Sequence, residues 1–244
     1  MISLIFTLSA PLPYILGFKG ELKTPIGYLR VTNRAMLRSS VYGFFKTQFA
    51  YRHGLRALFP KDYFFPLIID VGANIGDLPL AMKRHAGKII ALEPGEENFS
   101  ALNANLQINH VDNAVPVRVA ATDREGEVFL QGENSNMYVN PEKKGHPARG
   151  SPLDLIVDKL KIGSVDLLKV DAQGHERFVL LGMNSLMRRR LVKLLIVEAH
   201  VKRGVSVADI VSFMEARGYY LVHRDPYLFD QPHLYFASSE LRAS

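Results

Sequence analysis

LIIDVGANIGD, residues 67–77, joins a short apolar run to a glycine-rich turn. Nearly every residue of the run is apolar, as in a strand of a parallel sheet that helices cover on both faces. Gly72 and Gly76 allow a tight turn and a close approach of backbone to a ligand, and Asn74 tolerates the positive φ angle that such a turn needs. We therefore predict the first strand and the first strand-to-helix turn of an α/β nucleotide-binding sheet.

The rest of the chain repeats this alternation of strand and helix. Helix-type segments, with apolar residues three and four apart, separate further apolar runs of strand type. The predicted strands are 67–72, 88–94, 115–121, 165–171, 193–200, 219–224 and 233–238, and the predicted helices are 76–85, 95–109, 176–190 and 206–218. The loop between the last two strands is too short for a helix, so these strands form an antiparallel pair. The pattern predicts a doubly wound, mostly parallel seven-stranded sheet that ends in an antiparallel hairpin, with helices on both faces.

The bulk composition limits the classes of function. The 244 residues suit one α/β domain with an extension. The absence of cysteine excludes disulfides, thiolate zinc sites and a cysteine nucleophile, and it suits a cytoplasmic protein. A net charge of +6 favours acidic partners, but no basic stripe interleaved with aromatic residues is present, so nucleic acid is not the expected partner.

The first 65 residues differ in character from the alternating part. We predict an N-terminal flap or lid over residues 1–65 and a cofactor-binding domain over residues 66–244. Proline interrupts the apolar N-terminus at positions 11 and 13, so no membrane-spanning helix is expected there. Residues 20–31 suggest a hairpin or extended pieces, residues 34–55 have helical spacing, and residues 131–152 are interpreted as one long polar loop.

Two acidic residues accompany the glycine turn. Asp70 ends the first predicted strand, where it can fix the turn or meet a cationic part of a ligand. Glu93 ends the second strand 23 residues later, a spacing at which a carboxylate can accept hydrogen bonds from both ribose hydroxyls of a nucleoside. The turn and Glu93 together predict a nucleoside site.

The turn does not match the phosphate-binding motifs. A dinucleotide site needs G-x-G-x-x-G, and a phosphate cradle needs G-x-x-x-x-G-K-[ST]; neither pattern is in the sequence. An acidic-Gly-x-Asn-x-Gly turn without lysine suits a ligand that has a ribose, no phosphate and an amino-acid end. S-adenosylmethionine fits this description.

Five motifs, in order, resemble those of the FkbM-type methyltransferases. They are DVGANIGD, EPGEENFSALNANLQIN, AATDREGEV, LDLIVDKLKIGSVDLLKVDAQGHE and VEAH, and they extend from Asp70 to His200. The resemblance implies the Rossmann-like class I methyltransferase fold. It also implies that Asp70, Gly72, Asn74 and Gly76 hold the methionine end of the cofactor, that Glu93 holds the ribose, and that Asp123 lies near the adenine.

The strand order that the resemblance implies brings the ends of 165–171 and 193–200 together at one edge. Asp171 would face the methyl group, and Glu198 and His200, two apart on one strand, would point to the same crevice. His175 and Glu176 open the next helix. We treat these five residues as candidate catalytic residues, with His175, His200 or Asp171 as a base, or with a divalent cation held by Asp171, Glu176, Glu198 or His200.

One position departs from the family's usual D-x-E-G-x-E motif. Gln173 stands where a glutamate is expected. A glutamine keeps a hydrogen-bonding amide, but it does not take up a proton and binds a hard cation less strongly.

These residues predict an S-adenosylmethionine-dependent methyltransferase that acts on oxygen. The resemblance implies a small-molecule or glycan acceptor: a hydroxyl on a sugar, a glycolipid or a polyketide-type natural product. The net positive charge favours an acidic or phosphate-bearing acceptor. Methylation of RNA or protein, and a non-catalytic cofactor-binding scaffold, stay open as alternatives, as do the metal requirement and the oligomeric state.

Overall fold

The computed structural model describes the chain in five stretches, which include the whole of the alternating part except one loop. They are residues 4–5, 20–24, 26–31, 52–225 and 231–239. The description below concerns these residues.

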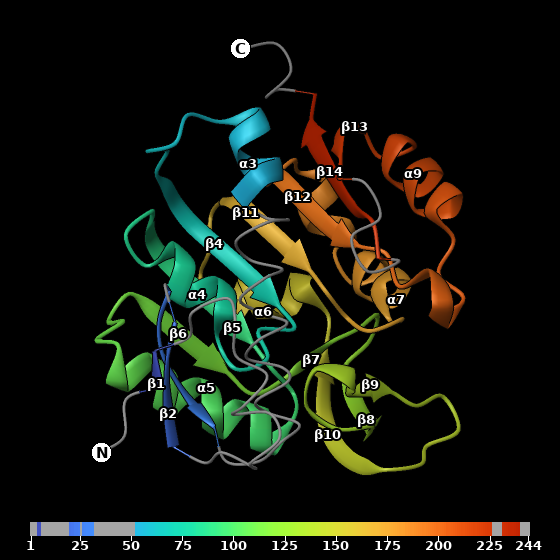
Figure 1. Ribbon diagram of the computed structural model, residues 1–244. Coiled ribbons are helices and arrows are strands. Elements are labelled where there is room, and N and C mark those ends of the chain that lie inside the picture. The colour runs from blue at the N-terminus through green and yellow to red at the C-terminus, as the bar shows by residue number, and fades with distance from the viewer. Residues whose placement is uncertain (1–3, 6–19, 25, 32–51, 226–230, 240–244) are drawn as a thin grey trace.

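A seven-stranded sheet crosses the centre of the described part (Figure 1). Its strands are β4 (Phe65–Val71), β5 (Ala86–Leu92), β6 (Ala114–Val117), β11 (Val165–Val170), β12 (Val192–Glu198), β13 (Tyr219–Arg224) and β14 (His233–Ser238). The order across the sheet is β13-β14-β12-β11-β4-β5-β6, and β14 runs antiparallel to both of its neighbours. The predicted mostly parallel sheet with a C-terminal antiparallel hairpin is confirmed.

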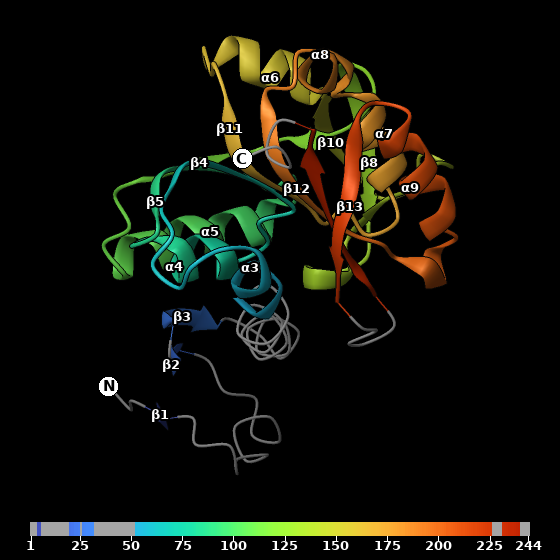
Figure 2. The ribbon, with the colours of Figure 1, turned by 90° about the horizontal axis from the view of Figure 1, so that it is seen from above.

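Helices cover both faces of this sheet (Figure 2). On one face lie α3 (Arg52–Leu58), α4 (Asp77–Met82) and α5 (Glu96–Ile108), and on the other lie α6 (Leu153–Lys159), α7 (Glu176–Leu181), α8 (Asn184–Arg188) and α9 (Val207–Glu215). Successive strand residues serve opposite faces, because side chains alternate along a strand. Ile68 packs in the cluster with α3 and α4, whereas Ile69 packs in the cluster with α6 to α9. Both are fully buried, so the strands are apolar on both faces.

A second, smaller sheet corrects two predictions. Residues 115–121 do not form one strand, because the chain leaves the central sheet after β6. Residues 131–152 are not one loop. The second sheet has the order β7-β10-β8-β9, and its strands are β7 (Ala120–Ala121), β8 (Gly126–Gln131), β9 (Tyr138–Val139) and β10 (His146–Ser151). It lies beside the carboxyl ends of the central strands (Figure 1).

The predicted helix over residues 176–190 is two helices, α7 and α8. The chain turns at Gly182, where an added Cβ atom would lie 2.0 Å from the carbonyl oxygen of Thr122. Backbone therefore packs directly on backbone at this point, and a glycine allows that approach. The short helix α6 was not predicted. Its first turn is fixed to α8 by Asp154, which accepts hydrogen bonds from the backbone N–H groups of Ser185 and Leu186.

The predicted hairpin over residues 20–31 is confirmed as β2 (Gly20–Thr24) and β3 (Gly27–Val31), with β1 (Leu4–Ile5) parallel to β2. It packs against the carboxyl-terminal part of α5. Asn109 accepts from the backbone N–H of Tyr28 at 2.7 Å, and Asn105 accepts from that of Arg30 at 2.7 Å. The predicted helix over 34–55 lies outside the described residues except at α3. Among the described helices, none combines the length and apolarity needed to cross a membrane.

Candidate active site

The carboxyl ends of β4, β5 and β11 open onto a cleft of about 930 Å³. The cleft lies at the edge where open α/β sheets bind their ligands. Its polar lining consists of Asp70, Asn74, Asp77, Glu93, Asn98, Ser135, Tyr138, Lys169, Asp171, Gln173 and His175.

The glycine turn forms one wall of the cleft. Gly72 has φ +76° and Asn74 has φ +50°, so both lie in the left-handed region that the sequence pattern predicted for this turn. A Cβ atom on Gly72 would lie 1.9 Å from the carbonyl oxygen of Asp171, which means that the two strand ends touch backbone to backbone. Gly76, at φ +100°, precedes α4 and shapes the turn without lining the cleft.

Glu93 is almost completely buried at the end of β5. Its carboxylate accepts hydrogen bonds from the backbone N–H groups of Asn74 at 2.9 Å and Gly95 at 3.0 Å, and from the amide of Asn98 at 3.3 Å. Burial raises the pKa of Glu93 to about 7, although these hydrogen bonds oppose the shift. The side chain therefore ties the glycine turn to the next strand and titrates near neutral pH.

Lys169, on β11, lies among the carboxylates of the cleft and was not among the predicted site residues. Its ammonium group is 3.0 Å from Asp70 and 3.4 Å from Asp171, and it donates to the carbonyl of Gly72 at 3.1 Å. Lys169 and Asp70 are also direct partners in the register of β11 and β4. The lysine thus neutralises charge at both strand ends and holds the turn.

Asp171, just after β11, connects the cleft to a buried group of polar side chains. Its Oδ2 atom faces Lys169, and its Oδ1 atom accepts a hydrogen bond from the Gln173 amide at 3.3 Å. The same Oδ1 atom lies 3.6 Å from Nε2 of His200. Asp171 lines the cleft, whereas His200 lies behind it.

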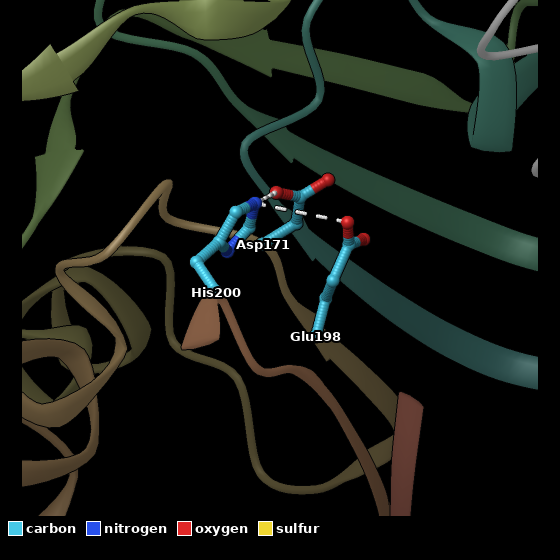
Figure 3. A group of neighbouring side chains, drawn as sticks. All are labelled: Asp171, Glu198 and His200. Atoms are coloured by element: carbon cyan, nitrogen blue, oxygen red, sulfur yellow. Dashed lines mark ion pairs between the residues drawn. The ribbon is translucent and has the colours of Figure 1, made fainter. Parts of the chain in front are cut away.

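His200 follows β12 and is 1% exposed. Its Nδ1 atom is 2.7 Å from the carboxylate of Glu176, and its Nε2 atom is 3.7 Å from Glu198 and points toward Asp171 and Glu198 (Figure 3). Burial alone would lower the pKa of His200, but the hydrogen bond that His200 donates to Glu176 and the charges of Asp171, Glu176 and Glu198 outweigh burial and raise that pKa.

Glu176 and Glu198 are both fully buried, and neither lines the cleft. Glu176 also accepts hydrogen bonds from the backbone N–H groups of Ala172, at 3.2 Å, and Gly174, at 3.0 Å. Glu198 lies 3.3 Å from Nε2 of His233 on β14. Glu176 thus holds the turn after β11, and Glu198 connects the end of β12 to β14.

His175 lies at the start of α7, between the cleft and a second groove, and lines both. Its Nε2 atom is 2.9 Å from the Thr122 hydroxyl, and its ring stacks on Phe178 with centroids 4.5 Å apart. Burial lowers the pKa of His175, although the charges of Glu176 and Asp123 oppose the shift. The imidazole is therefore neutral at neutral pH, the form in which a histidine accepts a proton.

The second groove, with a volume of about 1210 Å³, runs along the small sheet. It contains the aromatic side chains of Phe129, Tyr138 and Phe178 and the charged side chains of Asp123, Arg124, Glu125, Glu127, Lys143 and Arg203. Asp123 therefore lines this groove rather than the cleft, and it accepts a hydrogen bond from the Thr122 hydroxyl at 3.1 Å. The structure does not bring Asp123 together with the other predicted cofactor residues.

The structure brings together most of the predicted site residues. Asp70, Gly72, Asn74, Glu93, Asp171 and His175 line the cleft, and Glu176, Glu198 and His200 lie behind Asp171. Sequence reasoning missed Lys169, Asp77 and Asn98. Lys169 carried a usable signal, because a charge inside an otherwise apolar strand needs a buried partner.

The strand order and the position of the cleft define a Rossmann-like methyltransferase fold. Residues 70–221, more than half of the chain, match the methyltransferase FkbM domain family, and the chain belongs to this family. The resemblance drawn from the five motifs is thus confirmed.

Individual relatives agree with the family. The hexuronic acid methyltransferase AglP of Haloferax volcanii is 27% identical over 150 residues, which cover 59% of this chain and 59% of that protein. Methyltransferase 1 of Beauveria bassiana is 27% identical over 191 residues, which cover 67% of this chain and 74% of that protein. The crystal structure of a methyltransferase FkbM from Methylobacillus flagellatus has a TM-score of 0.53 at 19% identity, over 72% of this chain and 44% of that chain, and it supports the fold.

Proposed function

We propose that this protein is an S-adenosylmethionine-dependent methyltransferase that methylates a hydroxyl group. The observation that carries the proposal is the cleft itself, in which the glycine turn, Glu93 and Asp171 converge in a chain of this family. The alternating part also lacks the motifs that bind the phosphates of a dinucleotide or a nucleoside triphosphate.

Each end of the cofactor has a matching part of the cleft. The ribose hydroxyls lie against Glu93, and the adenine lies against the apolar lining that Leu92, Val119 and Leu130 provide. The methionine end lies over the glycine turn. Its sulfonium lies near Asp70 and Asp171, whose negative charge suits a cation.

Methyl transfer then needs an acceptor aligned with the sulfonium and a group that removes its proton. The acceptor oxygen attacks the methyl carbon as the carbon–sulfur bond breaks, and the electron pair of that bond stays on sulfur. The hydroxyl proton passes to the imidazole of His175, because this neutral histidine lines both the cleft and the second groove. The products are a methyl ether and S-adenosylhomocysteine. His200 is less suited to this step, because it is buried behind Asp171 and its pKa is raised.

The second groove supports a sugar-type acceptor. Aromatic faces at Phe129, Tyr138 and Phe178 offer flat apolar surface for a ring, and charged groups on its rim can bind polar substituents. Arg203 and Lys143 can bind a carboxylate. The name of the Haloferax relative, a hexuronic acid methyltransferase, supports testing acidic sugars first.

Two measurements test the proposal. Calorimetry is expected to give one S-adenosylhomocysteine site per chain, with no comparable binding of NADH or ATP. Transfer of a labelled methyl group is then measured with uronic acid glycosides, neutral glycosides, macrolides and RNA. Tight binding of NADH or ATP without binding of adenosylhomocysteine contradicts the cofactor assignment, and transfer to RNA but to none of the hydroxylated small molecules contradicts the acceptor assignment.

A further inference from the structure

Three potential metal-ligand atoms surround one point beside the cleft (Figure 3). They belong to Asp171, Glu198 and His200. Nε2 of His200 is 3.6 Å from Oδ1 of Asp171 and 3.7 Å from Oε1 of Glu198, and the ligand atoms of the three residues all lie within 4.8 Å of one another. We propose that this group binds one divalent cation of the Mg²⁺ or Mn²⁺ type at the inner edge of the cleft.

The size of the triangle supports this proposal. In the plane of three atoms at these separations, the point equidistant from all of them lies about 2.4 Å or less from each, close to the metal–ligand distances of roughly 2.0–2.6 Å found for divalent cations in proteins. By contrast, 3.6 and 3.7 Å are longer than the hydrogen bonds of about 2.7–3.2 Å that an imidazolium would donate. The space thus suits an ion between the three side chains better than a proton on one of them.

The buried imidazole supplies an independent observation. Nε2 of His200 has no hydrogen-bond partner in the described part of the chain, although the side chain is 1% exposed. Its other ring nitrogen is engaged with Glu176 at 2.7 Å. In metal sites, a carboxylate that accepts from one ring nitrogen of a histidine turns the lone pair of the other nitrogen toward the ion. In a neutral His200 held this way, the Nε2 lone pair faces the two carboxylates of Asp171 and Glu198, an arrangement that a cation stabilises.

The negative charge of the nearby carboxylates also favours the binding of a cation. The carboxylates of Asp70, Glu176 and Glu198 are buried, and that of Asp171 is half-buried beside them. Lys169 contacts Asp70 and Asp171. Lys169 faces Oδ2 of Asp171, whereas Oδ1, which accepts a hydrogen bond from Gln173, lies on the side of His200. Carboxylate oxygens with one imidazole nitrogen suit Mn²⁺ well and Mg²⁺ acceptably.

The proposed ion lies next to the cleft, because Asp171 is part of the cleft wall. A divalent cation at this point lowers the pKa of a hydroxyl that binds to it. This role in the reaction rests on the proposed function, whereas binding of the cation does not.

Mn²⁺ binding to the full chain tests the site without any turnover. The protein is treated with a chelator, dialysed and titrated with MnCl₂ at pH 8 while the electron paramagnetic resonance signal of free Mn²⁺ is followed. We expect one Mn²⁺ per chain. Glu198→Gln keeps the shape of the side chain and removes one anionic ligand, so we expect Mn²⁺ affinity to fall at least about tenfold. Asp171→Asn is the second variant if Glu198→Gln does not fold.

Asp166→Asn is the matched control. Asp166 is also a buried carboxylate of β11, but it lies at the other end of the strand, bound to Lys193 at 2.7 Å. The Mn²⁺ affinity of the Asp166→Asn variant is expected to equal that of the wild type. Absence of stoichiometric Mn²⁺ binding, or equal affinity in folded Glu198→Gln and wild type, overturns the inference. Adenosylhomocysteine binding is measured on the same samples, so failure of the cofactor assignment is distinguished from failure of the cation site.

Discussion

Two histidines of the site lie in opposite surroundings. His175 is half-buried between the cleft and the second groove, stacks on Phe178 and contacts the Thr122 hydroxyl. His200 is buried among the carboxylates of Asp171, Glu176 and Glu198. The pKa of His175 is lowered by burial, whereas the carboxylates raise that of His200 in spite of its burial.

The difference indicates that the exposure and the charged neighbours of each histidine, rather than its residue type, decide which role we propose for it. A neutral imidazole beside the proposed acceptor groove can accept a proton. An imidazole with one nitrogen held by a carboxylate has a fixed orientation, and its positive charge, when it is protonated, offsets the negative charge of the carboxylates around it. The following predictions test this contrast, from the largest expected effect to the smallest.

Replacement of His175 tests its proposed catalytic role. His175→Ala is expected to lower kcat by about 10²–10⁴-fold, the usual contribution of a general base, with adenosylhomocysteine affinity within about threefold of the wild type. In the wild type, the acid limb of the kcat/KM profile is expected below pH 6.5, the ordinary value for a histidine, because burial lowers the pKa of His175. His146→Ala, on the exposed edge of β10, is the control. An unchanged kcat in His175→Ala would assign the proton transfer to another group.

Neutralisation of Glu176 tests the buried histidine. Glu176→Gln weakens the hydrogen bonds of a fully buried carboxylate to His200, Ala172 and Gly174, so we expect the free energy of unfolding to fall by about 1.5–3 kcal/mol in urea. Glu215→Gln, on the exposed face of α9, is expected to change it by less than about 0.5 kcal/mol. Equal stability of the two variants would mean that Glu176 does not hold His200.

Glu93, the carboxylate at the proposed ribose end of the cleft, gives a pH-dependent effect of intermediate size. With its pKa raised to about 7, Glu93 changes from about one-tenth to about nine-tenths ionised between pH 6 and pH 8, so adenosylhomocysteine affinity is expected to rise about ninefold over this range. Glu93→Gln is expected to bind more weakly at pH 8 and to remove the pH dependence. An equal slope in wild type and variant would assign the titration to a different group.

The same pKa shift predicts a stability effect of the opposite sign. The native state holds a proton on Glu93 between the ordinary pKa of 4.5 and about 7, whereas the unfolded state has lost it. The contribution of Glu93 to stability is therefore present below pH 4.5 and is lost as the pH rises to 7. Urea titrations of the cofactor-free wild type and Glu93→Gln at pH 5 and pH 7.5 measure this difference.

The smallest effect is expected at the rim of the second groove. The Arg203 guanidinium lies 4.5 Å from the centroid of the Tyr138 ring and donates to the carbonyl of Asn136 at 3.2 Å. Arg203→Ala is expected to raise the KM for the acceptor by about two- to fivefold, with kcat unchanged, as suits a solvent-exposed cation–π contact. Lys202→Ala, at the neighbouring exposed position, is the control.

Sequence reasoning predicted the central sheet well, because its strands are apolar runs and the turn after β4 needs glycine at Gly72. It did not predict the small sheet, since β8 and β10 carry charges and glycines and face solvent on one side. The break at Gly182 was also missed, because it depends on contact with Thr122, 60 residues away in the chain.

The sequence predicted the part of the candidate site that lies at the ends of strands, but it did not predict the contacts between side chains. Asp70, Glu93 and Asp171 end strands, and the sheet topology brings strand ends together. The separate roles of His175 and His200 depend on side-chain neighbours such as Phe178 and Glu176, and the sequence pattern does not contain that information. Lys169 was read as part of an apolar strand, although its charge is the feature that connects Asp70 to Asp171.

The contact between Gly72 and the carbonyl of Asp171 has a consequence for protein engineering. Any side chain larger than hydrogen at position 72 would push the two loops apart, so the glycine turn and the loop after β11 can only shift as one unit. Efforts to enlarge the cleft for longer sulfonium analogues should therefore leave position 72 intact and remodel the proposed adenosine end, around Asn98 and Leu130.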